Sequence, residues 1–159
     1  MFMVVEYQLV DATNKIMGRF CSQIAKKALL GEFIVIINAK DAIISGTKGN
    51  IHERYLAKLK ISTATNPLRG PFHERRPDTF MRRVIKQMLP RKKFRGKQAL
   101  RRVHVYISDI PERFKIRYQK IVPIEIDYAD KRRLSQFNKF ITLENLCLRI
   151  GWNKKEIEA

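Results

Sequence analysis

The sequence predicts an α/β fold in which a small, mostly parallel sheet is covered by helices. Residues 33–38, "FIVIIN", are a continuous run of β-branched and apolar residues, which is typical of a strand buried on both faces of a parallel sheet. A short strand over 7–12 and a helix over 19–30 precede it, so the first forty residues have β-α-β order. The length of 159 residues corresponds to one domain, and we expect residues 1–159 to form it.

Three helices have clear apolar stripes. The helix over 19–30 places its apolar residues on one face and is followed by Gly31, a residue suited to end a helix. A second helix is expected over 50–60, and a third begins where Asp78 or Thr79 caps it and ends before Pro90. The expected inward residues are Ile51, Tyr55, Leu56 and Leu59 in the second helix, and Phe80, Met81, Val84, Ile85, Met88 and Leu89 in the third.

The rest of the chain alternates loops with short elements. Residues 62–77 form a long loop with three prolines, which is typical of a functional or disordered segment. A short helix from Arg95 or Gly96 through Arg102 leads into a strand over 103–107. Pro123 restricts "IVPIEI" to an edge strand or a segment outside the sheet. After a polar connection over 129–140, Thr142 caps a last helix that Gly151 ends.

The overall charge points to a polyanionic partner. The formal net charge is +18 and the sequence pI is about 10.3, so nucleic acid and an anionic membrane surface are the two candidate partners. The longest apolar run, 33–39, is too short to span a bilayer, and the N-terminus has Glu6 but no basic region typical of a secretory signal. We therefore expect a cytoplasmic protein with no membrane partner.

The positive charge is concentrated in residues 66–102, which we call the basic segment. It carries thirteen basic residues against the acids Glu74 and Asp78, a surplus of +11 within the total of +18. The basic residues are Arg69, Arg75, Arg76, Arg82, Arg83, Lys86, Arg91, Lys92, Lys93, Arg95, Lys97, Arg101 and Arg102. A solvated charged face is the ordinary interpretation of such a run, but the single sign and the abundance of Arg favour phosphate binding.

RNA is favoured over DNA as the partner. The chain has no helix-turn-helix, no zinc-finger spacing and no basic region followed by a heptad zipper. Irregular basic loops with aromatic residues suit folded RNA better than a uniform duplex. Phe72 and Phe94 lie in such loops, and Phe94 fits either a loop anchor or a base-stacking residue.

The sequence gives little support to an enzyme. Gly18 stands alone where a dinucleotide-binding turn requires three glycines, and the P-loop pattern is absent. We expect His52 on a helix surface and His104 as a structural strand residue, whereas His73 would contact phosphate or base, or fix its loop. Cys21 and Cys147 lie far apart on apolar helix faces, so we expect core packing and no metal, cofactor or catalytic site.

The stretch "GPFHERRPDTFMRRVIKQMLPRKKFRGKQALRR" resembles the signature of the ribosomal protein L-thirteen family. That family has a Gly-Pro-x-His-x-Arg-x-Pro loop, here Gly70 to Pro77, then a helix ending Met-Leu-Pro and an Arg-Gly-Lys segment, here Arg95 to Lys97. The opening "DATNKIMGRF" through "AIISG" is also similar, and the short "IGW" ending is similar to the archaeal and eukaryotic branch. The family usually has a glycine before Met-Leu-Pro, where this chain has Gln87.

The resemblance implies a three-layer α/β/α protein with a basic loop-and-helix extension that binds and stabilises large-subunit ribosomal RNA beside neighbouring ribosomal proteins. It implies no enzymatic activity, cofactor or small-molecule substrate. Arg19 and Lys48 are weaker candidates for RNA binding; they lie near turns into helices, whose N-termini favour anions. The expected RNA-binding residues are Arg69, His73, Arg75, Arg76, Arg82, Arg83, Lys86, Arg91, Lys92, Lys93, Arg95, Lys97, Arg101, Arg102, Arg19 and Lys48. The rival hypothesis is an RNA-modifying or nucleotide-dependent enzyme on a doubly wound fold.

Overall fold

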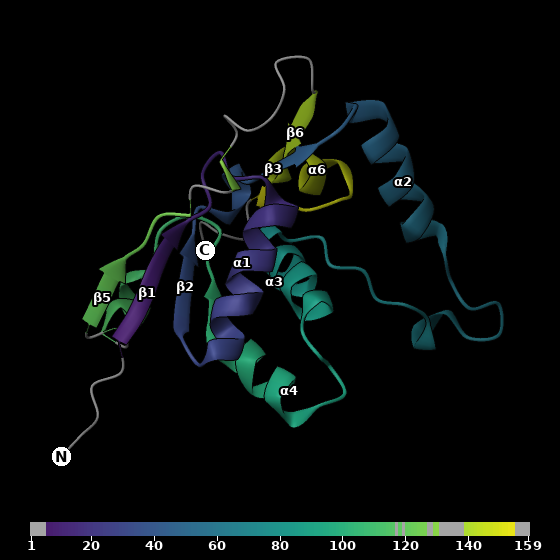
Figure 1. Ribbon diagram of the computed structural model, residues 1–159. Coiled ribbons are helices and arrows are strands. Elements are labelled where there is room, and N and C mark those ends of the chain that lie inside the picture. The colour runs from purple at the N-terminus through teal and green to yellow at the C-terminus, as the bar shows by residue number, and fades with distance from the viewer. Residues whose placement is uncertain (1–5, 117, 119, 127–128, 131–138, 155–159) are drawn as a thin grey trace.

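A four-stranded parallel sheet forms the centre of the computed structural model (Figure 1), which describes residues 6–116, 118, 120–126, 129–130 and 139–154. The strands are β1 (Glu6–Asp11), β2 (Phe33–Ile37), β4 (Val103–Val105) and β5 (Lys120–Pro123), in the order β4-β2-β1-β5. Every neighbouring pair is parallel. The predicted α/β class is confirmed, and Pro123 lies in an edge strand, where a missing amide costs no ladder hydrogen bond.

One face of the sheet carries the main core. Strand pairing places Val10, Ile34, Ile36 and Val103 on this face, and all four are fully buried. They belong to one apolar cluster with residues of α1 (Met17–Leu30) and α3 (Pro77–Met88). Each such side chain stabilises the fold by about 1.5–3 kcal/mol relative to leaving it exposed.

The opposite face is covered by aromatic side chains. Tyr7 and Phe33 are partners in the β1–β2 register, and their ring centroids lie 5.6 Å apart. Tyr118 contacts Tyr7 edge-on at 4.8 Å, and its hydroxyl lies 2.7 Å from that of Tyr106. The four-residue helix α5 (Glu112–Lys115) adds Phe114, which contacts Tyr106. Since Val35 on this face is also fully buried, β2 is apolar and buried on both sides, as its sequence predicts.

Helix α1 follows the predicted pattern closely. Its buried residues include Phe20, Cys21 and Ile24, which share one helix face. Gly31 ends the helix with a φ of 107°, a conformation that costs a glycine little, and its amide donates to the carbonyl of Ala28. Cys21 is fully buried, and burial raises the pKa of its thiol to about 12, so it acts as an apolar core residue.

Helix α3 ends before Pro90 as predicted, but its start and one residue of its buried stripe differ from the prediction. It begins at Pro77, so the expected cap at Asp78 or Thr79 is wrong: proline, which has no amide hydrogen, fits the first helical position. Phe80, Met81 and Ile85 are buried as expected. Met88 is 42% exposed, so the buried stripe passes from Ile85 directly to Leu89.

The C-terminal helix closes one end of the body. α6 (Leu143–Arg149) follows the small antiparallel sheet of β3 (Ile43–Ser45) and β6 (Phe140–Thr142). The Thr142 hydroxyl accepts a hydrogen bond from the Asn145 amide at 3.4 Å, so the predicted cap is confirmed. The predicted connection before it lies mostly outside the described residues.

Helix α2 (Lys48–Lys60) and the loop after it project from the body, and we call residues 48–76 the arm (Figure 1). Leu56 was expected to face inward but is 45% exposed, because the arm has little body beside it. His52 was expected on the surface but is only 7% exposed. The loop contains a short 3-10 turn, Pro67–Arg69.

The basic segment is not simply appended to the body. Its helices α3 and α4 (Phe94–Arg101) both pack against α1, and both also contact β4. Only the loop at its start belongs to the projecting arm (Figure 1). The short helix begins at Phe94, one or two residues before its expected start at Arg95 or Gly96, with Lys93 in the capping position.

Candidate nucleic-acid interface

The side of α3 that faces away from the core is basic. Arg82 and Lys86 are exposed, and Arg83 is half-buried. Together with Arg91, which follows the helix, these residues line a surface hollow that we call the cation hollow. The same helix therefore anchors the core with one face and presents three clustered cations with the other, and Arg91 beyond its end adds a fourth.

The turn from α3 to α4 presents a second group of cations. Arg91, Lys92 and Lys93 are all exposed, and Arg95 and Lys97 follow on α4. Gly96 is buried between them, and a Cβ atom added there would overlap the Pro90 carbonyl. This glycine is needed because two segments of the protein itself meet closely, which leaves the neighbouring cations directed to solvent.

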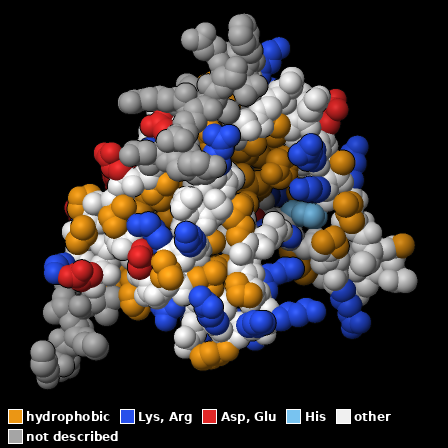
Figure 2. Space-filling model, viewed as in Figure 1, with side chains coloured by type: hydrophobic (Ala, Val, Ile, Leu, Met, Phe, Trp, Pro, Cys, Tyr) orange, Lys and Arg blue, Asp and Glu red, His pale blue; other side chains and the backbone are white. Residues whose placement is uncertain are grey.

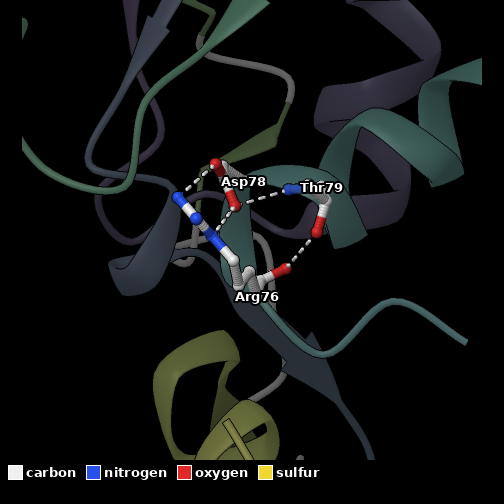
Figure 3. Close-up of polar contacts among 3 residues, drawn as sticks. All are labelled: Arg76, Asp78 and Thr79. Atoms are coloured by element: carbon white, nitrogen blue, oxygen red, sulfur yellow. Dashed lines mark hydrogen bonds and ion pairs between the residues drawn. The ribbon is translucent and has the colours of Figure 1, made fainter. Parts of the chain in front are cut away.

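Two arginines at the start of α3 are held by protein contacts, and Figure 3 shows those of Arg76. The Arg76 guanidinium pairs with the Asp78 carboxylate through nitrogen–oxygen distances of 3.2 and 3.3 Å, and the Thr79 hydroxyl donates to the Arg76 carbonyl. The Arg75 guanidinium lies against the backbone of Gly151. Both side chains are still exposed, as is Arg69 in the 3-10 turn. The acid Asp78 reduces the charge that Arg76 offers to a partner.

Some candidates serve the fold or lie apart. The Arg102 guanidinium donates to the Ala28 carbonyl at 3.4 Å and lies 5.9 Å from the Phe33 ring, so it joins α1 to the sheet, whereas Arg101 is exposed. Arg19 is exposed near the start of α1, and it makes a contact within the protein. Lys48 begins α2 and lines a different hollow with Lys139.

The three histidines have different surroundings. His73 is half-buried in the arm, and its Nε2 atom is buried without a hydrogen-bond partner within the described part of the chain. His52 Nδ1 lies 3.0 Å from Arg149 Nη1. Because a guanidinium can only donate, this nitrogen accepts and the ring is neutral; burial, and next the cations of Arg149 and Lys48, lower the pKa of His52. His104 contacts the Tyr118 ring, which fits its predicted structural role.

The charge distribution separates two sides of the molecule (Figure 2). Lys and Arg side chains gather over α4, over α3 and where the arm faces the body, whereas many acidic side chains lie towards β1 and β5. The basic side also contains an acidic residue, Glu74, which lines the cation hollow. A predominantly positive face of this kind attracts polyanions, and their binding relieves the repulsion among its cations.

Sequence patterns did not identify the residues that α2 contributes to the candidate interface. Tyr55 packs against Phe80 with ring centroids 5.4 Å apart, and Lys58 Nζ lies 4.9 Å from the centre of the Tyr55 ring. Both residues lie outside the basic segment, so charge counting could not select them. The helical spacing of Tyr55 indicated only that it faces inward.

The place where a doubly wound fold would bind a nucleotide is acidic here. Asp11, at the end of β1, and Glu125 and Asp130, beyond β5, line a hollow at the carboxyl ends of these strands. Lys15 is 3.5 Å from the Asp130 carboxylate, which already neutralises this cation. Burial alone would raise the pKa of Asp11, but hydrogen bonds from Thr13 and Asn38 lower it and keep the carboxylate charged. Three carboxyl groups repel a phosphate, so the structure does not favour the enzyme hypothesis.

Within the described residues, the His, Cys, Asp and Glu side chains form no group of three that could hold a metal ion. Helices long and apolar enough to cross a membrane are likewise not found in that part of the chain.

The fold and the surface define a basic α/β protein whose parallel sheet supports one strongly cationic side. Comparison with known proteins is more specific. The chain belongs to the family described as Ribosomal protein L13, whose model matches residues 6–111. The predicted resemblance is confirmed.

Curated relatives carry the name Large ribosomal subunit protein uL13. The protein of Methanopyrus kandleri is 38% identical over 147 residues, covering 92% of this chain and 88% of the relative. That of Methanococcoides burtonii is 37% identical over 143 residues, covering 90% and 96%. That of Caenorhabditis elegans is 32% identical over 151 residues, covering 95% and 72%. The matches therefore include archaeal and eukaryotic proteins, as the sequence predicts.

Proposed function

We propose that this protein is a non-enzymatic structural constituent of the large ribosomal subunit. It binds and stabilises large-subunit ribosomal RNA during assembly and translation, contacts neighbouring large-subunit proteins, and works in the cytoplasm on the ribosome. Residues 1–159 act as a single domain. Family membership supports the ribosomal role, and the names of the curated relatives state the subunit.

The observation that carries RNA binding is the two-sided use of α3. Its buried face fixes the helix to α1 and the sheet, while Arg82, Arg83 and Lys86 point away from the core beside the exposed turn 91–93. Rigid placement lowers the cost of ordering these long side chains on a phosphate backbone. RNA phosphates would also remove the repulsion that these cations exert on one another.

The role of each candidate follows from its position. Arg69, Arg75, Arg76, Arg82, Arg83 and Lys86 would contact RNA backbone from the arm and α3, with Arg76 weakened by Asp78. Arg91, Lys92, Lys93, Arg95, Lys97 and Arg101 would enter a groove or junction. Arg102 would act mainly through the fold. Arg19 and Lys48 would make separate, weaker contacts, and the role of His73 is argued in the next subsection.

The test is RNA binding by the triple variant Arg91→Ala, Lys92→Ala and Lys93→Ala. We expect weaker binding to large-subunit ribosomal RNA and a log–log salt slope shallower by about two to three, because each lost phosphate contact removes nearly one released counterion. The thermal midpoint of the free protein should hardly change, because all three side chains are exposed. A collapse of the fold would assign these residues a structural role.

A matched control removes the same charge elsewhere. Lys26, Lys60 and Lys115 are exposed and lie outside the basic segment. Their triple replacement by Ala should reduce the salt slope much less. Equal losses in the two variants would contradict the assignment of binding to residues 66–102, though not RNA binding itself.

The ribosomal role has its own test. A tagged chain expressed in cells should sediment with large subunits in a sucrose gradient. Recovery only in the light fractions would count against the proposal, whatever the purified protein binds.

A further inference from the structure

A second hollow lies between α2 and α3, next to the cation hollow. It has a volume of about 230 Å³, far more than one water molecule needs. Tyr55 and Lys58 line it from α2, Phe80 and Arg83 from α3, and His73 from the loop of the arm. We call it the α2–α3 hollow, and Ile150, just after α6, completes its lining.

Its lining combines aromatic and apolar surface with hydrogen-bonding groups. Tyr55 and Phe80 contact each other through their rings at 5.4 Å and form an aromatic wall. His73 lines the same hollow, and its Nε2 is buried without a partner among the described residues. A buried polar atom in this state is costly, so a ligand that offers it a hydrogen bond is favoured. A ligand with a flat ring and polar edge groups would match both the aromatic wall and the unpartnered His73 nitrogen.

The surroundings of this hollow select an anionic ligand. Lys58 stands over Tyr55, and Arg83 lines the α2–α3 hollow and the cation hollow alike. Its guanidinium is oriented by a hydrogen bond of 2.6 Å to the Phe72 carbonyl. The cation hollow adds Arg82, Lys86 and Arg91, so five cations surround the two hollows against one carboxylate, that of Glu74, which lines both. The α2–α3 hollow, with its aromatic wall and hydrogen-bonding groups, therefore adjoins the cation hollow, which suits a phosphate. Arg83 lines both.

Gln87, like Arg83, lies between the α2–α3 hollow and the cation hollow. It is exposed, it lines both hollows, and its amide can donate and accept hydrogen bonds. This is the position at which the sequence departs from the glycine usual in the resembling family. A glycine here would offer no side chain to a ligand in either hollow.

We propose that the α2–α3 hollow binds one unpaired base of the RNA, while the cation hollow holds an adjoining phosphate. The base stacks against the Tyr55 and Phe80 wall, and His73 Nε2 and the Gln87 amide bond its polar edge. Single bases turned out of folded RNA are commonly bound in this way, by stacking together with hydrogen bonds to their edges. This inference rests on the proposed RNA binding and adds to it a site that reads a base.

The test compares two RNA probes by fluorescence anisotropy with the full chain. One is a 12-mer of adenosine, and the other is a 12-mer of the same backbone with every base removed. The wild-type protein should bind the adenosine probe about tenfold more tightly or more, since stacking of one base on aromatic side chains has an effect of that order. Both probes should show steep salt dependence.

Variants separate the base site from the phosphate site. Val84→Phe fills the α2–α3 hollow, and should abolish most of the preference for adenosine while leaving binding of the base-free probe unchanged. Gln87→Ala changes an exposed residue and should reduce the preference a few-fold without affecting folding. Arg82→Ala, which alters only the cation hollow, should weaken both probes equally.

The control is Leu56→Phe, which adds an aromatic ring to the exposed face of α2 outside both hollows. It should leave the ratio of the two affinities unchanged. Equal binding of both probes by the wild type, or an unchanged ratio in Val84→Phe and Gln87→Ala, would overturn the base site; the hollow would then suit a protein side chain instead. Salt-independent or absent binding of both probes would overturn the proposed RNA binding itself.

Discussion

Helices α2 and α3 have almost the same length, 13 and 12 residues, but they have different positions in the molecule. α3 buries Phe80, Met81 and Ile85 and packs against α1 and the sheet. α2 buries only Ile51 and His52, and it projects with the arm (Figure 1). The comparison teaches that basic charge does not decide which helix joins the body. The spacing of the apolar residues, together with what lies opposite them, decides it.

The same difference has a functional side. A helix held firmly by its apolar face can present cations at fixed positions, whereas a helix held at one end can adjust to a partner. The two helices meet through Tyr55 and Phe80, beside the α2–α3 hollow. The proposed base site thus lies where the firmly held helix and the projecting helix touch.

The largest expected effect is the loss of core packing on α3. Ile85 is completely buried, so Ile85→Ala should lower the free energy of unfolding by about 2–5 kcal/mol. Leu56→Ala on α2 removes a side chain that is 45% exposed and should cost about 0.5 kcal/mol or less. Urea unfolding of both variants measures the difference, and equal losses would show that the arm is as firmly packed as the body.

The next effect concerns two glycines. A Cβ at Gly96 would overlap the backbone of Pro90, so Gly96→Ala should destabilise the protein by about 1–3 kcal/mol. Gly49 in the first turn of α2 has nothing within 4 Å of an added Cβ. Gly49→Ala should therefore stabilise the protein by up to about 1 kcal/mol through helix propensity. Opposite signs in thermal unfolding are the expected result; a neutral Gly96→Ala would mean that the turn after α3 adapts freely.

The smallest effect is a pH dependence of stability that comes from His52 on α2, which contacts Arg149 on α6. The pKa of folded His52 lies below its ordinary value of 6.5, so the unfolded chain takes up this proton at a higher pH than the folded protein does. The stability from neutral His52 is thus fully present above about pH 6.5, and it falls as acidification passes through the folded pKa. Urea unfolding between pH 7.5 and 5.5 should show this fall.

His52→Gln supplies the matched control for that measurement. Its amide oxygen can still accept a hydrogen bond from Arg149 but does not titrate in this range. The variant should be less dependent on pH than the wild type over the same window. Identical pH profiles for the two proteins would show that folding does not favour the neutral form of His52.

Sequence periodicity predicted the body well because local patterns determine it. The β-branched run of β2, the stripe of α1 with Gly31, the Thr142 cap and the edge strand at Pro123 each depend on neighbouring residues. The misplaced start of α3 has a local cause too: Pro77 serves as the first helical residue, so the helix needs no side-chain cap from Asp78 or Thr79.

The errors on α2 have a different origin. His52 is buried because Arg149, at the opposite end of the chain, lies against it, and Leu56 is exposed because no segment covers it. Neither fact is contained in the helical spacing of residues 50–60. Tertiary contacts decided both.

The candidate interface was likewise predictable only in part. Counting charge found the cations of the cation hollow and the turn 91–93, since they lie within one stretch of sequence. It could not separate Arg102, which joins α1 to the sheet, from Arg101 beside it. It also could not find the α2–α3 hollow, whose lining comes from α2, the loop of the arm, α3 and Ile150.

The parallel sheet has a consequence for the growing polypeptide. β1 pairs with β2 on one side, soon after both have been synthesised, but its other partner is β5 at Lys120–Pro123. During most of translation the first strand therefore has one edge without its native neighbour, and such an edge can template pairing with a second nascent chain. Arrival of β5 seals that edge, and its Pro123 leaves the finished sheet with a border poorly suited to further pairing.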